Sequence, residues 1–175
     1  MMVTVDYIDF QSRSEPLAFL ITFRTYGTWL HGETRGSIDR HRYHRYGTQA
    51  MPANKKIFDE EKSALKHPPV ILNRLQRSAT EAAIREVCER RGYFRHAIKV
   101  RTNHVHSVIT ASCKPEHVLE AFKAYATRKL REANLVKREI KPWARHGSTV
   151  YLWTDEQVNR AIAYVLEGQG EEPFQ

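Results

Sequence analysis

Residues 94–111 read FRHAIKVRTNHVHSVITA, and their pattern of apolar residues predicts the two strands of a β-hairpin. In the first half, apolar and polar residues alternate as they do in a half-buried strand. Thr102 and Asn103 then make a short turn, and an apolar run extends from His104 to Ala111. Two such runs joined by a short turn indicate paired, antiparallel strands.

The sequence on either side of the hairpin predicts two more strands and three helices. The strands are expected at residues 17–24 and 149–153, and the helices at residues 71–91, 115–133 and 155–168. The first of these helices is expected to bury Leu72, Leu75, Ala79, Ala82 and Val87. This order of elements indicates an α+β fold, a ferredoxin-like sandwich in which helices pack on an antiparallel sheet.

Residues 26–69 interrupt this regular order. They contain several glycines and prolines and show little sustained periodicity. A segment of this length is too long for a passive connection. We therefore expect a functional loop, or an insertion with short elements of its own.

Length and composition favour a single domain covering residues 1–175, with an apolar fraction of 41% that is sufficient for a core. No run approaches the roughly 18 apolar residues of a membrane span. The N-terminal residues lack the basic start and apolar stretch of a secretion signal. Cys88 and Cys113 fit no metal-ligand spacing, and two cysteines are weak evidence for a disulfide framework. These features predict a reduced, cytoplasmic protein.

The net charge of +8 and the sequence pI of about 9.6 favour a polyanionic partner such as nucleic acid. Two basic segments carry much of this excess. Residues 40–47 interleave arginines that can hold phosphates with tyrosines on which unpaired bases can stack, although a solvated polar loop would look the same. The residues predicted to contact DNA are Arg40, Arg42, Tyr43, Arg45 and Tyr46 in this segment, and Lys123, Arg128, Lys129 and Arg131 in the segment 123–145.

His104 and His106 stand one residue apart in a predicted strand, so both imidazoles point to the same face. Two neutral imidazoles can supply part of the ligand shell of a divalent metal ion. The His-x-His pattern alone is unspecific, because paired histidines also occur on solvated faces. The opposite face of the strand is at least as apolar, so the histidines need not point into the core, and a position in a groove remains open for them.

A tyrosine close to a divalent cation can attack a phosphate and form a covalent phosphotyrosine. Tyr164 lies in the last predicted helix, about 200° around the helix axis from Ile162 if each residue turns 100°. That geometry predicts a tyrosine on the outward face of a well-anchored helix. An ordinary exposed tyrosine would show the same pattern.

Taken together, Asn103-His-Val-His106, a basic helix, a strand containing tryptophan and a last helix carrying Tyr164-Val resemble the single-tyrosine HUH transposases of bacteria. This family includes the transposases of small insertion sequences and the REP-associated tyrosine transposases. The resemblance covers most of the chain outside residues 40–69, and the tyrosine follows His106 by 58 residues.

The resemblance implies a DNA transposase that cuts and rejoins single-stranded DNA hairpins, usually as a homodimer. His104 and His106 would bind Mg²⁺ or Mn²⁺, and Tyr164 would be the nucleophile that gives a 5′-phosphotyrosine. Family members often have Gln or Asn four residues after the tyrosine, where this chain has Gly168. Gln169 is the expected third ligand, with Glu167 as its rival.

Two other functions remain open from the sequence. The chain could be a domesticated protein of the same fold that binds DNA hairpins without cutting them. It could also bind RNA on its sheet, although it lacks the alternating strand aromatics of such domains.

Overall fold

The computed structural model describes residues 14–30 and 54–168, and within them one sheet of four strands in the order β2–β3–β1–β4. The strands are β1 (Ala18–Thr25), β2 (Phe94–Val100), β3 (His104–Thr110) and β4 (Trp143–Leu152). All three pairings are antiparallel. This order is that of a ferredoxin-like split βαβ fold, so the predicted α+β class is confirmed.

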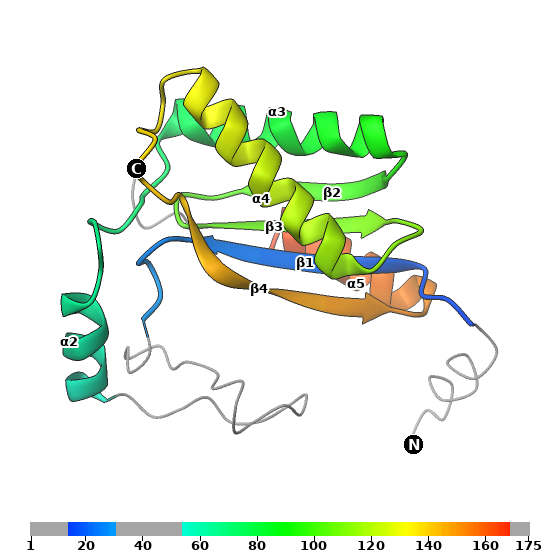
Figure 1. The fold of residues 1–175 in the computed structure, drawn as a ribbon. Coiled ribbons are helices and arrows are strands. Elements are labelled where there is room, and N and C mark those ends of the chain that lie inside the picture. The colour runs from blue at the N-terminus through cyan, green and yellow to red at the C-terminus, as the bar shows by residue number, and fades with distance from the viewer. Residues whose placement is uncertain (1–13, 31–53, 169–175) are drawn as a thin grey trace.

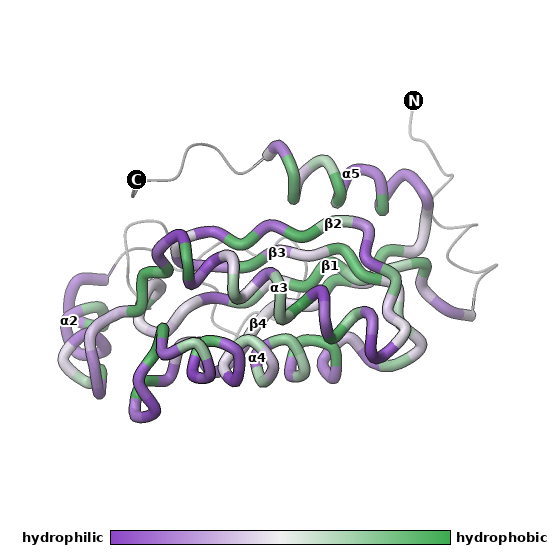
Figure 2. Tube along the Cα trace, turned by 90° about the horizontal axis from the view of Figure 1, so that it is seen from above, coloured by the Kyte–Doolittle hydropathy of each residue, from purple (hydrophilic) through white to green (hydrophobic). Residues whose placement is uncertain are grey.

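Helices cover both faces of the sheet. Helices α3 (Arg74–Arg91) and α4 (Pro115–Glu132) lie on one face, and α5 (Asp155–Leu166) lies on the other (Figures 1 and 2). Helix α2 (Lys55–Ser63) belongs to the predicted insertion and has no buried residue. In the described residues, no helix combines the length and apolar character that crossing a membrane requires.

Each face of the sheet has its own core. Phe19, Ile21 and Phe23 of β1 pack toward α3 and α4 together with the buried side chains of those helices. On the other face, Val108 of β3 and Val165 of α5 belong to a smaller cluster. Because β1 is buried on both sides, its sequence reads as a nearly continuous apolar run.

The predicted buried stripe of α3 is partly wrong. Leu75 is 66% exposed and Ala82 is also exposed, whereas Val87 is buried as expected. The helix begins three residues later than predicted, after a capping box formed by Asn73 and Gln76. The residues that α3 buries recur at the helical spacing, starting from Thr80. Because Thr80 is polar, a search for apolar residues alone does not find this stripe. The buried residues are Thr80, Ala83, Ile84, Val87 and Cys88.

Two strand predictions also differ from the structure. Strand β4 begins at Trp143, six residues before the predicted start, and reaches β1 across an irregular register between Phe23 and Thr25. In β2, a register shift between Arg95 and Ala97 breaks the simple alternation of faces. Such bulges add a residue to one strand, so periodicity alone does not locate them.

Candidate active site

The two predicted histidines lie side by side on the face of the sheet that α5 covers. They are at alternate positions of β3, and their ring centroids are 4.6 Å apart. Their face also carries Val108, which packs in the α5 core. His106 is only 7% exposed, while His104 is half-buried. The histidines therefore sit at the edge of the apolar contact between α5 and the sheet.

Each imidazole is oriented by a hydrogen bond at Nδ1. Asn103 Oδ1 accepts from His104 Nδ1 at 2.6 Å, which leaves Nε2 as the basic nitrogen of the neutral ring. His106 Nδ1 lies 2.6 Å from Thr22 Oγ1 of the neighbouring strand β1. A bond of this kind sets the ring direction of a metal-binding histidine, and where Nδ1 is the donor, as in His104, it also sets the tautomer. A metal ion at this pair would be bound through Nε2.

Tyr164 comes from α5 and reaches the same place. Its ring centroid is 5.4 Å from that of His106, in an edge-to-face arrangement, and the residue is 46% exposed. The expectation of an outward-facing tyrosine is thus only half right. The ring is half-exposed, but it also contacts the side chain of His106 on β3. The reason is that α5 lies across this face, so a flank of the helix still meets the strands.

Of the two predicted third ligands, only Glu167 is among the described residues. Gln169 lies outside the described residues. Glu167 is the exposed C-cap of α5, and its backbone N–H donates to Ala163 O at 2.8 Å. Within residues 14–30 and 54–168, no group of three or more His, Cys, Asp or Glu side chains is placed to hold a metal ion. The described geometry therefore does not bring Glu167 to the histidine pair, and Gln169 stays a prediction.

Thr22 is a site residue that the sequence did not reveal. It stands in β1, 84 residues from His106, and reaches it only through the β1–β3 register. Asn103 belonged to the recognised motif, but nothing in the sequence assigned it the hydrogen bond to His104. The position of Asn103 directly before His104 was the one feature of the sequence that could have suggested this bond.

The predicted DNA contacts fall into two groups. Arg40, Arg42, Tyr43, Arg45 and Tyr46 lie outside the described residues. Lys123, Arg128, Lys129 and Arg131 are on α4, on the opposite face of the sheet from the histidines (Figure 2).

Two of the α4 residues have structural partners in the backbone. Lys123 Nζ donates to the carbonyl oxygens of Ala144, Arg145 and His146 at 2.8–3.3 Å. Arg131 Nη2 donates to the carbonyl oxygens of Arg138 and Ile140 at 2.9 and 3.4 Å. These bonds tie α4 to the chain that leads into β4.

The other two, Arg128 and Lys129, form long ion pairs with Glu86 of α3, at 3.7 and 3.9 Å. Both side chains are about half exposed, at 49% and 45%. Exposed pairs of this kind contribute little to stability and can be exchanged for other anions. Of the four α4 residues, these two are the better placed for a polyanion.

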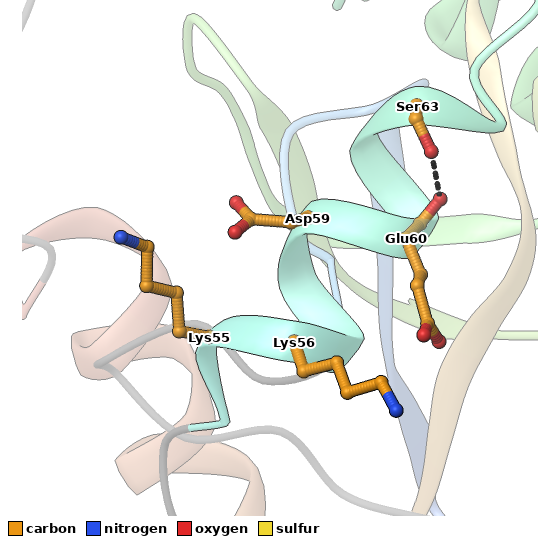
Figure 3. A pocket seen from close by; sticks show the side chains of 5 residues that line it. All are labelled: Lys55, Lys56, Asp59, Glu60 and Ser63. Carbon is orange, nitrogen blue, oxygen red and sulfur yellow. Dashed lines mark hydrogen bonds between the residues drawn. The ribbon is translucent and has the colours of Figure 1, made fainter.

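A separate hollow runs along α2, as Figure 3 shows. It is lined by Lys55, Lys56, Asp59, Glu60 and Ser63, all on one short helix. Ser63 Oγ donates to the Glu60 carbonyl oxygen at 2.8 Å. The hollow contains none of the predicted site residues, and its lining of mixed charges on a solvated helix defines no chemistry.

His96 of β2 is packed against its neighbours on the sheet. Its Nε2 lies 2.9 Å from Thr110 Oγ1, and its ring contacts Phe94 edge to face. Burial lowers the pKa of His96 below its usual value, because desolvation disfavours the charged imidazole. It is thus a neutral polar contact at neutral pH, separate from the histidine pair.

No family model matches the sequence, and no curated protein matches it. Among solved structures, the chain is similar to a “putative transposase” from Deinococcus radiodurans R1, with a TM-score of 0.45, 11% identity, and coverage of 87% of this chain and 91% of that one. It is also similar to a REP-associated tyrosine transposase bound to a REP hairpin, with a TM-score of 0.47, 10% identity, and coverage of 86% and 65%. At this identity the likeness concerns the fold, and the roles of residues depend on the geometry above.

Proposed function

We propose that this chain, as one domain, is a metal-dependent single-tyrosine DNA transposase that nicks and rejoins single-stranded DNA hairpins. The observation that carries the proposal is that the rings of His104, His106 and Tyr164 lie close together. Their rings form a continuous series, with centroid distances of 4.6 and 5.4 Å, although the tyrosine comes from another element 58 residues further along. Adjacent metal ligands and a half-exposed phenol are what attack on a phosphate requires.

The histidine pair supplies part of the ligand set that a divalent cation needs. Two imidazoles with oriented Nδ1 atoms offer nitrogen ligands on one side. Gln169 is proposed to add an oxygen ligand, and such a mixed set suits Mg²⁺ less well than Mn²⁺, which accepts imidazole more readily. The bound cation would supply positive charge that stabilises the phosphate oxygens in the transition state.

The phenol oxygen of Tyr164 is the proposed nucleophile. It loses its proton and forms a bond to phosphorus, while the bond from phosphorus to the 3′ oxygen of the preceding nucleotide breaks. That oxygen takes up a proton and leaves as a free 3′-OH, and the DNA end stays on the enzyme as a 5′-phosphotyrosine. Attack by a 3′-OH on the phosphotyrosine reverses the step, so the energy of the broken bond is retained and no ATP is needed.

The proposed partners are single-stranded or hairpin DNA and a second copy of this chain. The net charge of +8 supports a polyanionic partner. Arg40, Arg42, Tyr43, Arg45 and Tyr46 remain proposed DNA contacts, as do the α4 residues Arg128 and Lys129. Lys123 and Arg131 are weaker proposals, since each already donates to backbone carbonyls.

A covalent-adduct assay tests the proposal. The protein is mixed with Mn²⁺ or Mg²⁺ and labelled single-stranded hairpins taken from the sequence that flanks its own gene, and SDS-resistant adducts are mapped by mass spectrometry. We expect an adduct on Tyr164 that is lost with EDTA and in Tyr164→Phe. Tyr151→Phe is the matched control, because Tyr151 is 41% exposed but lies on β4.

Other outcomes point elsewhere. An adduct that persists in Tyr164→Phe would show that another residue is the nucleophile. Tight hairpin binding with no adduct under either cation would favour the domesticated DNA-binding protein. Preference for an RNA hairpin over the DNA hairpin of the same sequence would favour the RNA-binding domain.

A further inference from the structure

An arginine and a tryptophan stack on one another close to the histidine pair. The guanidinium carbon of Arg24 lies 3.2 Å from the centroid of the Trp29 ring. Arg24 is directly opposite His104 in the β1–β3 register, and it shares its face of β1 with Thr22, the partner of His106. The stacked pair therefore stands on the same side of the sheet as the proposed site.

Trp29 is also held in a fixed relation to His104 through one residue, Asn103. The backbone carbonyl of Asn103 accepts from the Thr25 backbone N–H at 2.9 Å and from the Thr25 and Thr28 hydroxyls at 3.1 and 3.4 Å. The side chain of the same Asn103 accepts from His104 Nδ1 at 2.6 Å. The turn that carries Trp29 and the ring of His104 thus share a single anchor.

The turn itself is tightly placed rather than loose. Gly27 has a φ of +73°, and a Cβ there would lie 3.1 Å from the Cα of Pro69. Thr28 Oγ1 also donates to the Thr25 carbonyl at 3.0 Å. Yet Trp29 remains 37% exposed at the end of this ordered turn. Part of this ordered ring is therefore accessible to a ligand.

The chemistry of this pair suits an unpaired nucleobase. Indole rings and guanidinium planes both stack on bases of any sequence, and arginine adds positive charge for the adjoining phosphate. Lys99 contributes further positive charge from β2, where it is paired with His106. Cations thus stand on both strands that flank β3.

We propose that Arg24 and Trp29 form a stacking platform for a nucleobase of single-stranded DNA next to the phosphate that is cut. This inference rests on the proposed function, because it takes the histidines and Tyr164 as the place of cleavage. The platform fixes the strand by one base beside the metal site, so that the adjoining phosphate meets the phenol of Tyr164.

Binding without cleavage tests the platform. A fluorescein-labelled oligothymidylate of about 12 nucleotides, within the usual size of single-strand sites, is titrated in EDTA and followed by anisotropy. We expect Trp29→Ala to weaken binding by about 5- to 150-fold, the range for one lost base stack. Trp29→Phe should stay within about threefold of the wild type, because it keeps an aromatic face.

The matched control is Trp153→Ala. Trp153 stacks on Tyr151 just after β4, at the end of the sheet where Leu152 pairs with Ala18, away from Arg24. Its loss should leave oligonucleotide affinity unchanged. Thermal unfolding of each variant shows whether the fold is kept. A purely structural tryptophan would not be in contact with DNA, so quenching of tryptophan emission by the oligonucleotide gives a second readout: it should disappear in Trp29→Phe and persist in Trp153→Phe.

The outcomes separate this inference from the proposed function. Unchanged affinity in a folded Trp29→Ala, quenching that persists in Trp29→Phe, or no binding of the oligonucleotide by the wild type would each overturn the platform, even if Tyr164 adducts form. Conversely, binding that depends on Trp29 but yields no adduct on hairpin DNA would support base stacking at Arg24 and Trp29 and contradict the proposed nuclease activity.

Discussion

At the scale of single residues, the hydrogen bond between Thr22 and His106 links the sheet to the chemistry proposed here. Thr22 Oγ1 is 2.6 Å from Nδ1, so the ring of His106 is held by a neighbouring strand rather than by its own. Outer partners of this kind usually matter about 10- to 100-fold for metal affinity or activity. In the proposed site, Thr22 would thus orient the imidazole of His106 without binding the metal ion itself.

We predict that Thr22→Val lowers Mn²⁺ affinity and adduct formation by about 10- to 100-fold. Valine has the shape of threonine but no hydroxyl, so the Nδ1 hydrogen bond is lost while packing is kept. Calorimetric titration with Mn²⁺ measures the effect, and Thr22→Ser, which keeps the hydroxyl, should retain most of the affinity. Equal losses in the two variants would mean that packing, not the hydrogen bond, matters at this position.

A second residue-scale prediction concerns His96. Its pKa in the folded chain is lowered by burial, so the unfolded chain takes up the proton at a higher pH than the folded chain does. The unfolded state therefore binds more protons as the pH falls through about 6.5, and stability decreases. We predict that His96→Gln reduces the loss of stability between about pH 7.5 and 5.5.

Urea unfolding at the two pH values measures this difference. Glutamine can still bond to Thr110, so the contact at Oγ1 is largely preserved. His117→Gln, at an exposed position of α4, is the control for removing any histidine. The same pH dependence in His96→Gln as in the wild type would show that His96 does not contribute.

At the scale of elements, Gly147 and Gly92 are required for different structural reasons. Gly147 lies in β4, where a Cβ would be 2.7 Å from the Thr22 carbonyl oxygen and 2.8 Å from a Leu119 methyl carbon. Gly92 ends α3 with a φ of +67°, and nothing lies within 4 Å of its Cβ position. The first glycine allows a close approach of α4 and β1 to β4, and the second only supplies a left-handed cap.

We therefore predict that Gly147→Ala destabilises the fold more than Gly92→Ala. Backbone and core atoms would have to move for the first, which costs about 1–3 kcal/mol or more. The second adds the strain of one left-handed alanine, about 1–2 kcal/mol. Urea unfolding of both variants measures the order. A larger loss for Gly92→Ala would show that the space around Gly147 yields easily.

Helix and strand ends could be predicted where the residues that determine them lie close by in the sequence. The turn at Asn103, the cap at Gly92 and the pairing of Thr154 with Gln157 all lie within a few residues of what they determine. The start of β4 was not predictable in this way, because Arg145, His146 and Ser148 are polar and exposed and the strand pairs with β1 across an irregular register. The direction of Tyr164 depended on where α5 crosses the sheet, which no periodicity within the helix specifies.

At the scale of the whole molecule, the sheet separates the proposed chemistry from the basic helix α4. The histidines face α5, whereas α4 packs on the opposite side (Figures 1 and 2). A DNA molecule that touches both must pass around an edge of the sheet. The sequence could place the charges on one helix, but it could not tell which face that helix would cover.

This separation makes the role of α4 testable by salt dependence. Arg128 and Lys129 are half-exposed and form long ion pairs with Glu86, and Arg128 also pairs with Glu132 at 3.7 Å and lies over the ring of Tyr125. Exposed contacts of this kind are weak, so removing both side chains should cost at most about 1–2 kcal/mol of stability. If both contact phosphates of single-stranded DNA, the slope of log affinity against log salt should fall by roughly 1.4, about 0.7 for each contact. The double variant Arg128→Ala with Lys129→Ala is compared with the wild type on a single-stranded hairpin in EDTA.

The control comes from the same helix. Lys123 donates to three carbonyl oxygens at the start of β4, so Lys123→Ala should lower stability, measured by urea unfolding, more than the double variant does. An unchanged salt slope in the folded double variant would exclude this side of α4 from the DNA path. The polyanion would then be held on the face of the histidines, where Arg24 and Lys99 are paired with His104 and His106 across the neighbouring strands.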